Sequence, residues 1–152
     1  LYSSAASDVY KRQVQRVCHA SVKVEDKIVS EIGQGFLALV GIEVQDTEKD
    51  IIKKADKLCA LRIFSDENDK TNLSLKDVGG EILAVSQFTL CGDASHSNRP
   101  NFVNAMKPDE ARELFKLFVE RISSNGIAVK TGIFREHMHV ELINDGPFTI
   151  IL

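Results

Sequence analysis

Polar and apolar residues alternate near the start of the chain in a way that predicts two paired strands. Val22 and Val24 are separated by a polar residue, which is the period of a half-buried strand. Residues 25–27, Glu-Asp-Lys, are typical of a turn, and residues 28–32 have the pattern of a second strand. The sequence therefore predicts a β-hairpin. Residues 36–42 follow as a nearly continuous apolar run, which is typical of a strand buried on both faces.

Two helices are predicted by apolar residues at helical spacing. The first begins at Thr47, because Thr47 and Asp50 have the spacing of a capping box in which Asp replaces the usual Glu. The second begins near Pro108, a residue suited to the first turn, and ends at Asn125–Gly126. Their apolar stripes are Ile51, Ile52, Ala55, Leu58 and Cys59 in the first helix, and Ala111, Leu114, Phe115, Phe118, Val119 and Ile122 in the second.

Four further strands are predicted by short apolar runs at residues 81–88, 127–130, 138–143 and 148–152. Strands that alternate with helices favour a parallel core with helices on one face, and the end hairpins can supply an antiparallel layer. We therefore expect an α/β fold, as a three-layer α/β/β sandwich in a single domain with two helices on one face. Residues 91–107 are expected to form a long polar loop, and such loops are often functional.

The predicted domain covers residues 14–152. Residues 1–13 are polar, rich in Ser and Ala, and show no period. They are interpreted as a scar from expression or sequencing adapters, or else as a natural disordered extension. The length of 152 residues is that of one domain, and a domain of this size buries roughly 70% of its unfolded surface without a disulfide or a metal.

Composition and charge limit the location and the partners of the protein. The three cysteines, Cys18, Cys59 and Cys91, are widely spaced, which argues against a disulfide framework or a thiolate zinc site and favours the reducing cytoplasm. The longest apolar run, residues 36–40, is far too short to span a membrane. The net charge of −3 gives no sign of nucleic-acid binding, so any contact with RNA should use a local basic rim.

Two polar segments beside apolar strands are candidates for chemistry. The first follows a strand at its carboxyl end, a common place for active-site groups, and consists of Ser86, Gln87, Phe88 and Thr89. Its hydroxyls and free backbone N–H groups suit an oxyanion hole, although a strand end with satisfied hydroxyls has the same pattern. The second, residues 144–149 with the sequence Asn-Asp-Gly-Pro-Phe-Thr, is either a plain hairpin turn or a fixed backbone surface made by Gly146–Pro147.

Other reactive side chains give weaker patterns. His137 and His139 share one face of a regular strand, but the sequence places no third metal ligand beside them. Cys91 and His96 lie in the same polar loop, and two ordinary loop side chains are a simpler interpretation than a thiol–imidazole pair. The chain contains no G-x-S-x-G motif, no phosphate-binding glycine loop and no dinucleotide fingerprint. We therefore expect neither a metal nor another cofactor.

Together, the Ser86 and Asn144 segments resemble the paired signature of the D-aminoacyl-tRNA deacylase family, Ser-Gln-x-Thr followed near the C-terminus by Asn-x-Gly-Pro-x-Thr. Flanking pieces resemble the same family at residues 14–17, 20–22, 33–35 and 99–102. The resemblance covers essentially all of residues 14–152. Phe148 is a minor departure, because Val is common there, and Ser86 in place of Pro resembles the members with strict chiral selectivity.

The resemblance implies a proofreading hydrolase of translation quality control. It would release the D-amino acid from D-aminoacyl-tRNA, and glycine from wrongly charged tRNA-Ala, while rejecting L-aminoacyl groups. It would bind the tRNA acceptor end as a cytoplasmic homodimer with no membrane or DNA partner. Gly146–Pro147 of one subunit, with a cis bond, would enter the other subunit's pocket. A rigid backbone wall there rejects an L side chain whatever its chemistry.

The resemblance also assigns roles to two further residues and leaves the catalytic step open. Arg16 would support the Gly-Pro loop, with an exposed strand charge as the alternative, and Met138 would line the pocket, with a core position as the alternative. The nucleophile is either Thr89 or water aided by backbone groups and the terminal ribose 2′-OH, which only RNA has.

Two rival functions are a hydrolase in which His96 activates Ser86 or Thr89, and a non-catalytic tRNA- or protein-binding module.

Overall fold

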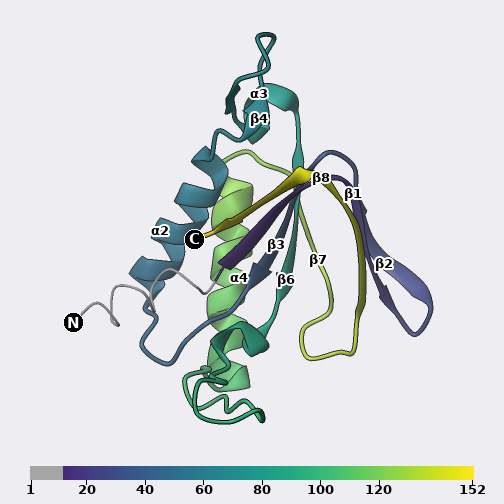
Figure 1. Cartoon of the computed structure of the whole chain (residues 1–152). Coiled ribbons are helices and arrows are strands. Elements are labelled where there is room, and N and C mark those ends of the chain that lie inside the picture. Colours follow the sequence, from purple (N-terminus) through teal and green to yellow (C-terminus); the bar gives the residue numbers. More distant parts are fainter. Residues whose placement is uncertain (1–11) are drawn as a thin grey trace.

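The computed structural model describes residues 12–152, in which six strands form one sheet and two long helices lie side by side against it (Figure 1). The strands of the sheet are β1 (Arg12–Val24), β2 (Lys27–Ile32), β3 (Gly35–Val40), β6 (Glu81–Ser86), β7 (Val129–Thr131) and β8 (His139–Ile151). The helices are α2 (Glu48–Ala60), α3 (Leu75–Val78), α4 (Pro108–Ser124) and the 3-10 helix η1 (Phe88–Cys91). The small pair β4 (Phe64–Ser65) and β5 (Thr71–Leu73) stands apart. The predicted mixed α/β class and single domain are confirmed.

The long strand β1 organises the sheet because it has three partners. Its first half pairs antiparallel with β3, its second half pairs antiparallel with β2, and β8 pairs antiparallel with nearly its whole length. The strands β3, β6 and β7 then continue the sheet in parallel. The carboxyl ends of β3 and β6 therefore meet at one edge, which is where α/β sheets commonly place binding groups.

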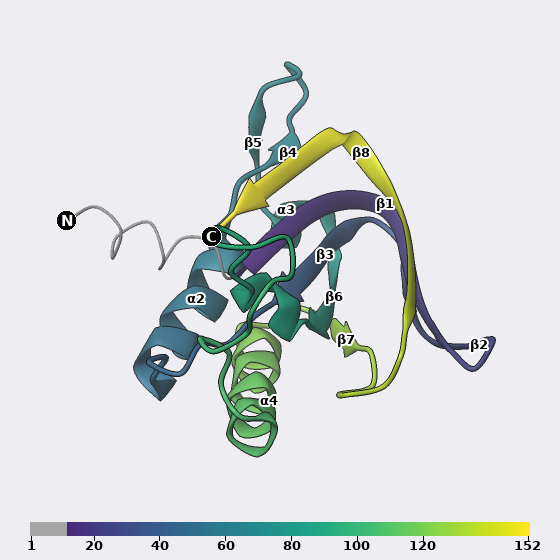
Figure 2. The same cartoon turned by 60° about the horizontal axis from the view of Figure 1, so that its bottom comes forward.

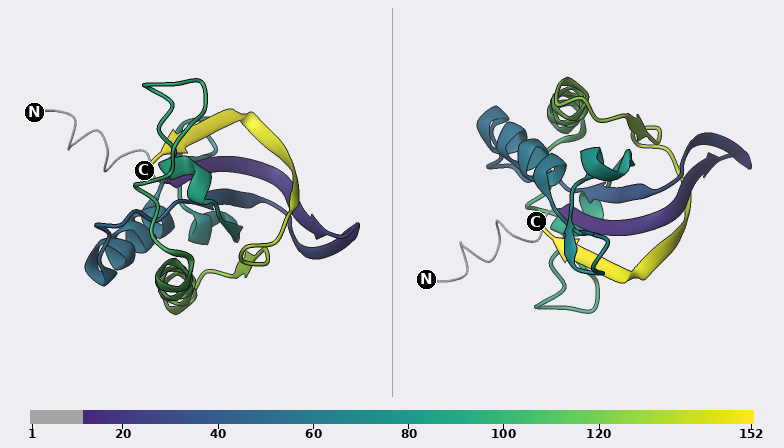
Figure 3. Two further views of the ribbon diagram at one scale, coloured as in Figure 1. Left: turned by 90° about the horizontal axis from the view of Figure 1, so that it is seen from below. Right: turned by 90° about the horizontal axis from the view of Figure 1, so that it is seen from above.

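Two apolar cores lie on opposite faces of this sheet. The larger core packs β3 and β6 against α2 and α4, with Phe36, Ile51, Ile82 and Phe118 fully buried. The smaller core joins residues of β6, such as Leu83, with residues of β8, although these strands are far apart in sheet order. The sheet is therefore strongly curved. Figure 2 shows β8 arching past β1 and β3, and the end views of Figure 3 show α2 and α4 together on one side of these strands.

The predicted helix starts are confirmed by their caps. The Thr47 hydroxyl accepts from the Asp50 N–H, and the Asp50 carboxylate accepts from the Thr47 N–H, so the capping box of α2 is complete. Pro108 occupies the first turn of α4. After Asn125, Gly126 adopts φ +83°, which ends the helix as predicted. No helix in residues 12–152 combines the length and the apolar character that a bilayer crossing requires.

Several predicted boundaries were wrong. The strand β6 ends at Ser86 rather than at residue 88, because the chain turns there into η1. The two strands expected at residues 138–143 and 148–152 are one bulged strand, β8. The elements β4, β5 and α3 were not predicted. All six strands belong to one sheet in residues 12–152. The separate second β layer of the predicted three-layer sandwich is therefore not confirmed.

The first strand begins before residue 14, the predicted start of the domain. Arg12 and Gln13 already belong to β1, where they pair with Val40 and Leu39 of β3. The Arg12 side chain is 2% exposed and is therefore part of the interior. The rest of the segment interpreted as a scar or an extension, residues 1–11, lies outside the described residues.

Candidate active site

A pocket of about 750 Å³ opens at the carboxyl ends of β3 and β6. Its walls come from four parts of the chain that the fold brings together. They are Ile42 after β3, residues 85–89 at the end of β6, the residues Phe102, Ala105, Pro108 and Ala111, and residues 134–138 with Val140. All four predicted residues Ser86, Gln87, Phe88 and Thr89 thus line the same pocket as the predicted Met138.

The Ser86–Thr89 segment is held at the pocket by its backbone. The Gln87 N–H donates to the Val40 carbonyl at 2.8 Å, which ties the end of β6 to the end of β3. The Gln87 side-chain amide donates to the Thr89 hydroxyl oxygen at 2.9 Å. Phe88 and Thr89 are the first residues of η1, so their N–H groups have no carbonyl inside the helix to donate to. The segment therefore presents backbone donors and a hydroxyl at the pocket wall.

Two glycines stand directly behind side chains that line the pocket. A Cβ on Gly92 would lie 2.8 Å from Cε1 of Phe102, whose ring packs edge-on against Phe88 with centroids 5.2 Å apart. A Cβ on Gly132 would collide with Sδ of Met138. The aromatic wall and the Met138 wall therefore keep their places because the backbone behind them carries no side chain.

The polar loop of residues 91–107 is tied down beside the pocket. The backbones of Asp93 and Asn101 exchange two hydrogen bonds, at 2.8 and 3.0 Å. The Ser95 hydroxyl and N–H both donate to the Asp93 carboxylate, and these bonds hold the pKa of Asp93 below its usual range. The loop ends against the body of the protein, where the Met106 N–H donates to the Ile42 carbonyl. Phe102 is thus carried by an ordered loop.

The Asn144–Thr149 segment is a bulge in β8 rather than the hairpin turn weighed from the sequence. Val17 pairs with Asn144 and Gln15 pairs with Thr149, so the four intervening residues, 145–148, stand opposite Arg16 alone. The Gly146–Pro147 bond is cis, as the resemblance implied, and both residues are exposed. The bulge therefore pushes this pair outward from the sheet.

Side chains of the same segment close the bulge from within. The Phe148 N–H donates to Oδ1 of Asn144 at 2.6 Å. The Asn144 amide donates to Gln15 on the neighbouring strand at 2.9 Å and to the Thr149 hydroxyl at 3.0 Å. The motif residues Asn144 and Thr149 thus fix the backbone between them. Asn144 and Thr149 therefore have a structural role in holding the bulge.

Arg16 holds the bulge from the outside. Its Nε donates to the Asp145 carbonyl at 3.0 Å, and its Nη1 donates to the Ile63 carbonyl at 2.7 Å. Its guanidinium carbon lies 4.6 Å from the centroid of the Phe148 ring, a cation–π contact. With a side-chain exposure of 12%, Arg16 is not the exposed strand charge of the alternative interpretation.

The two motifs do not meet within one chain. The pocket holds Ser86–Thr89 and Met138, and neither Arg16, Gly146 nor Pro147 is among the residues that line it. A single chain therefore presents two separate features, a pocket and a rigid outward bulge.

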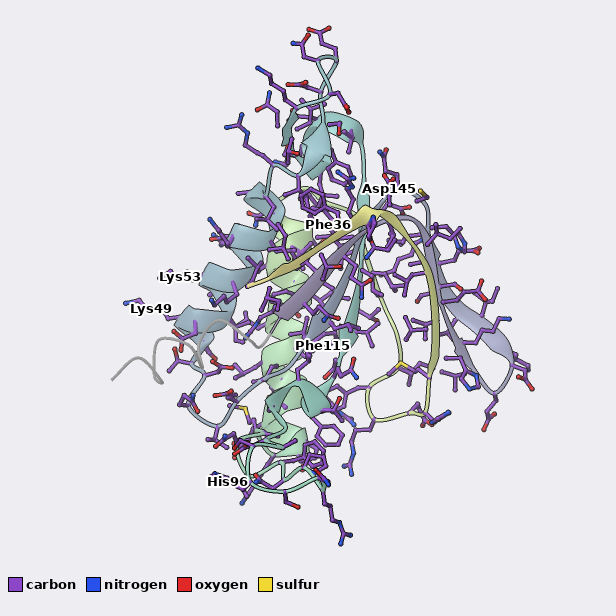
Figure 4. The ribbon with its side chains drawn as sticks, in the orientation of Figure 1. Phe36, Lys49, Lys53, His96, Phe115 and Asp145 are labelled. Atoms are coloured by element: carbon purple, nitrogen blue, oxygen red, sulfur yellow. The ribbon has the colours of Figure 1, made fainter. Side chains whose placement is uncertain are left out.

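Of the weaker candidate residues, His137 lines the pocket and His96 does not. His137 lines the pocket, with its ring 5.1 Å from that of His139, but within residues 12–152 no group of three or more His, Cys, Asp or Glu side chains could hold a metal ion. Cys91 is buried, whereas His96 is exposed on the loop and does not line the pocket (Figure 4). Sequence reasoning missed the walls made by Phe102, Ala111 and Phe134, because their patterns were those of a loop or a core stripe.

Comparisons with known proteins match this chain along nearly its whole length. The family model described as D-Tyr-tRNA(Tyr) deacylase matches residues 13–152. A protein of Thermodesulfovibrio yellowstonii named D-aminoacyl-tRNA deacylase is 54% identical over 139 residues, which cover 91% of this chain and 95% of the relative. A protein of Pelobacter propionicus with the same name is 52% identical over 142 residues, which cover 93% of this chain and 98% of the relative.

Solved structures agree in fold. The structure of a protein named c-Myc DNA Unwinding Element Binding Protein is 39% identical with a TM-score of 0.88, covering 93% of this chain and 97% of that one. A probable eukaryotic D-amino acid tRNA deacylase has a TM-score of 0.80 with the same coverage, and at 17% identity it supports the fold alone. With the family model and these relatives spanning the pocket and the bulge alike, the chain belongs to the D-Tyr-tRNA(Tyr) deacylase family of hydrolases.

Proposed function

We propose that this protein hydrolyses the ester bond of D-aminoacyl-tRNA and releases the free D-amino acid and the tRNA. The observation that carries the proposal is that one pocket is lined by both Ser86–Thr89 and Met138. The chain is also about half identical to proteins named D-aminoacyl-tRNA deacylase. Its volume of about 750 Å³ lies within the range of roughly 300–1,000 Å³ that is usual for small-ligand sites. That is room for an aminoacyl group joined to a terminal nucleoside.

The chemistry proposed for the pocket is stabilisation of a tetrahedral intermediate. The N–H groups of Phe88 and Thr89 at the start of η1 are placed to donate to the oxyanion that forms when water attacks the ester carbonyl. The Thr89 hydroxyl oxygen already accepts from the Gln87 amide, which withdraws electron density from it. Thr89 is therefore assigned a positioning role, and the terminal ribose 2′-OH and backbone groups are assigned the remaining catalysis.

The chiral selectivity is proposed to come from a second copy of the chain. Gly146–Pro147 is exposed, lies outside the chain's own pocket, and is fixed by Arg16. Exposed Ile143 and Ile151 flank this bulge on β8, at 59% and 45% exposure, which suits burial against another subunit. In such a homodimer the bulge of one subunit enters the partner's pocket and blocks L side chains, whereas glycine escapes the block. Glycyl-tRNA-Ala is therefore included as a substrate. The reaction is proposed to take place in the cytoplasm.

The test of the activity is incubation of the protein with D- and L-tyrosyl-tRNA while ester loss is followed. We expect rapid loss of the D ester only. Equal rates on the two esters would contradict the chiral filter. Binding without turnover would favour a non-catalytic nucleic-acid-binding module, a rival function because the 39% identical protein of known structure is named for binding a DNA element.

The shared site has a sharper test in mixed dimers. We expect Met138→Arg to block the pocket of its own subunit and Gly146→Leu to place a side chain in the pocket of the partner subunit, so that each variant alone is inactive. If pocket and bulge act across subunits, a mixture contains dimers with one intact site, and random pairing restores about one quarter of full activity. A mixture that stays inactive, with mixed dimers shown by mass, would contradict the arrangement.

A further inference from the structure

Three lysines form a row along the outer face of α2. Lys49, Lys53 and Lys57 are four residues apart, so they lie on one face of the helix, and all three are exposed. The buried side of α2 is formed instead by Ile51, Ala55 and Leu58. Figure 4 shows Lys49 and Lys53 extending from α2 into solvent, away from α4 and the sheet.

Two carboxylates of α2, Asp50 and Asp56, are engaged elsewhere. Asp50 accepts from the N–H and the hydroxyl of Thr47 in the capping box. Asp56 accepts from Arg121 and Asn125 on the inner side of the helix, at 2.7 to 3.0 Å. Within the described part of the chain, none of the three row lysines forms an ion pair. The row is therefore a concentrated positive surface on a protein whose net charge is −3.

This arrangement helps the helix only in its last turn, where Lys57 suits the helix dipole. Like charges four residues apart repel one another on a helix surface. Lys49 also lies in the first turn, where the helix dipole disfavours a cation. The acids of the first turn, Glu48 and Asp50, flank Lys49 but leave the three lysines as a like-charged row. Residues that break local rules without a local gain are expected at functional surfaces.

The row starts at the pocket end of the molecule. Ile42 lines the pocket, and the chain reaches the first turn of α2 only a few residues later. The segment between them is joined to the pocket's loop wall, because Glu43 pairs with Ala105 and the Val44 N–H donates to the Asn104 carbonyl. From Lys49 the row then runs about 12 Å away from the pocket at the rise of an α-helix.

We propose that Lys49, Lys53 and Lys57 bind the phosphate backbone of the acceptor arm of the tRNA whose 3′ end occupies the pocket. The proposal rests on the function proposed above. Ammonium groups bind phosphates as point charges and release counterions from the nucleic acid, which requires no base contact and so no sequence preference. The row supplies the local basic surface that an acidic protein needs for RNA, next to the site where the ester is cut.

The test compares a long and a short substrate in a neutralised variant. Lys49→Gln, Lys53→Gln and Lys57→Gln are combined, a change of −3 in charge that keeps good helix formers. Its substrates are D-tyrosyl-tRNA and the D-tyrosyl ester of adenosine, which is too short to reach α2. The control combines Lys27→Glu with Lys70→Gln, which also changes the charge by −3; Lys27 is the exposed first residue of β2 and Lys70 is exposed between β4 and β5, both outside the pocket and α2.

We expect the row variant to raise KM for D-tyrosyl-tRNA about tenfold, with kcat and the rate on the short ester unchanged. The slope of log Kd for uncharged tRNA against log salt should fall by about 2 to 3, roughly one for each lost contact. The control should match the wild type. Unchanged KM and slope, or an equal loss on both substrates, would overturn the proposal. If the wild type bound uncharged tRNA through the three lysines but hydrolysed no D-tyrosyl-tRNA, the lysine row would be supported and the proposed hydrolysis would be contradicted.

Discussion

The guanidinium of Arg16 lies over the ring of Phe148, 4.6 Å from its centroid, and so covers the bulge that carries Gly146–Pro147. The fit between these groups leaves little room for a side chain at residue 146. A Cβ on Gly146 would lie 3.0 Å from the Phe148 nitrogen and 3.3 Å from Nη2 of Arg16. Gly146 also has φ +140°, a conformation that side-chain-bearing residues rarely adopt.

Gly146→Ala is therefore expected to lower both stability and activity. The methyl group strains the backbone and presses on Phe148 and Arg16, so a loss of about 1 kcal/mol in the free energy of unfolding is expected. The displaced Pro147 should then reduce turnover of D-tyrosyl-tRNA and weaken the rejection of the L form. Denaturant unfolding and ester hydrolysis measured on the same preparation test both effects.

Gly33→Ala is the matched control for this substitution. A Cβ on Gly33 would meet nothing within 4 Å, so this variant should keep wild-type stability and turnover. A Gly146→Ala protein that folds, dimerises and retains both its rate and its preference for the D ester would show that residues 146 and 147 form only a turn.

The stability of the packing between α2 and α4 should depend on pH through Asp56. Hydrogen bonds from Arg121 and Asn125 lower the pKa of Asp56 from 3.8 to about 2. Because the folded-state value is the lower one, the stabilisation is fully present above the unfolded value and is lost as the pH falls toward about 2. The difference in unfolding free energy between wild type and Asp56→Asn should therefore be constant near neutral pH and shrink between about pH 4 and 2. A difference that stays constant down to pH 2 would contradict the assigned pairing.

Local signals in the sequence were sufficient for the two long helices, α2 and α4, and for the position of the Ser86 segment. Thr47 and Asp50 carry the start of α2 because a capping box is made by residues three apart. The Ser86 motif was placed correctly at the end of a buried strand because an apolar run and the polar residues after it are adjacent in sequence. Such features need no knowledge of the rest of the fold.

Features that depend on distant partners could not be predicted from local patterns. Gly146–Pro147 has the composition of a turn, and only its pairing with β1 shows that β8 continues past it. The pocket walls at Phe102 and Phe134 come from segments that meet only after folding. The elements β4, β5 and α3 are two to four residues long, too short to show a period.

Replacement of Arg12 by Met is expected to stabilise the protein. The Arg12 side chain is 2% exposed, and within residues 12–152 its Nε and Nη2 atoms have no hydrogen-bond partner. Burial lowers its pKa, although Asp46, 3.9 Å from Nη1, favours the charged form. A buried charge that is poorly paired costs more than its attraction returns, so Arg12→Met should add about 1 kcal/mol or more. Unfolding in denaturant measures this gain, and a lower midpoint for the variant would contradict it.

Thr89→Ala distinguishes a positioning hydroxyl from a nucleophile. If Thr89 attacked the ester, its removal should cost several orders of magnitude in kcat, as for the nucleophiles of other hydrolases. With the hydroxyl oxygen accepting from Gln87, we expect a loss of no more than about tenfold and no covalent acyl-enzyme. Single-turnover hydrolysis of D-tyrosyl-tRNA followed by mass spectrometry of the protein checks both statements.

Gly132→Ala should change the pocket without touching the substrate directly. The new methyl group would collide with Sδ of Met138, while Val22 Cγ1 at 3.4 Å leaves it little other room. Since the thioether is flexible, the chain should still fold, and Met138 should swing toward the pocket that it lines. We expect KM for D-tyrosyl-tRNA to rise more than kcat falls.

The double variant Gly132→Ala/Met138→Ala tests whether Met138 transmits the effect. Removing the thioether gives the methyl group space, so the double variant should resemble Met138→Ala alone rather than show the summed losses of the two single variants. Additive losses would mean that residue 132 acts on the pocket by another route, through the backbone that leads from β7 to β8. Gly132 would then be a support of the loop and not of the Met138 wall.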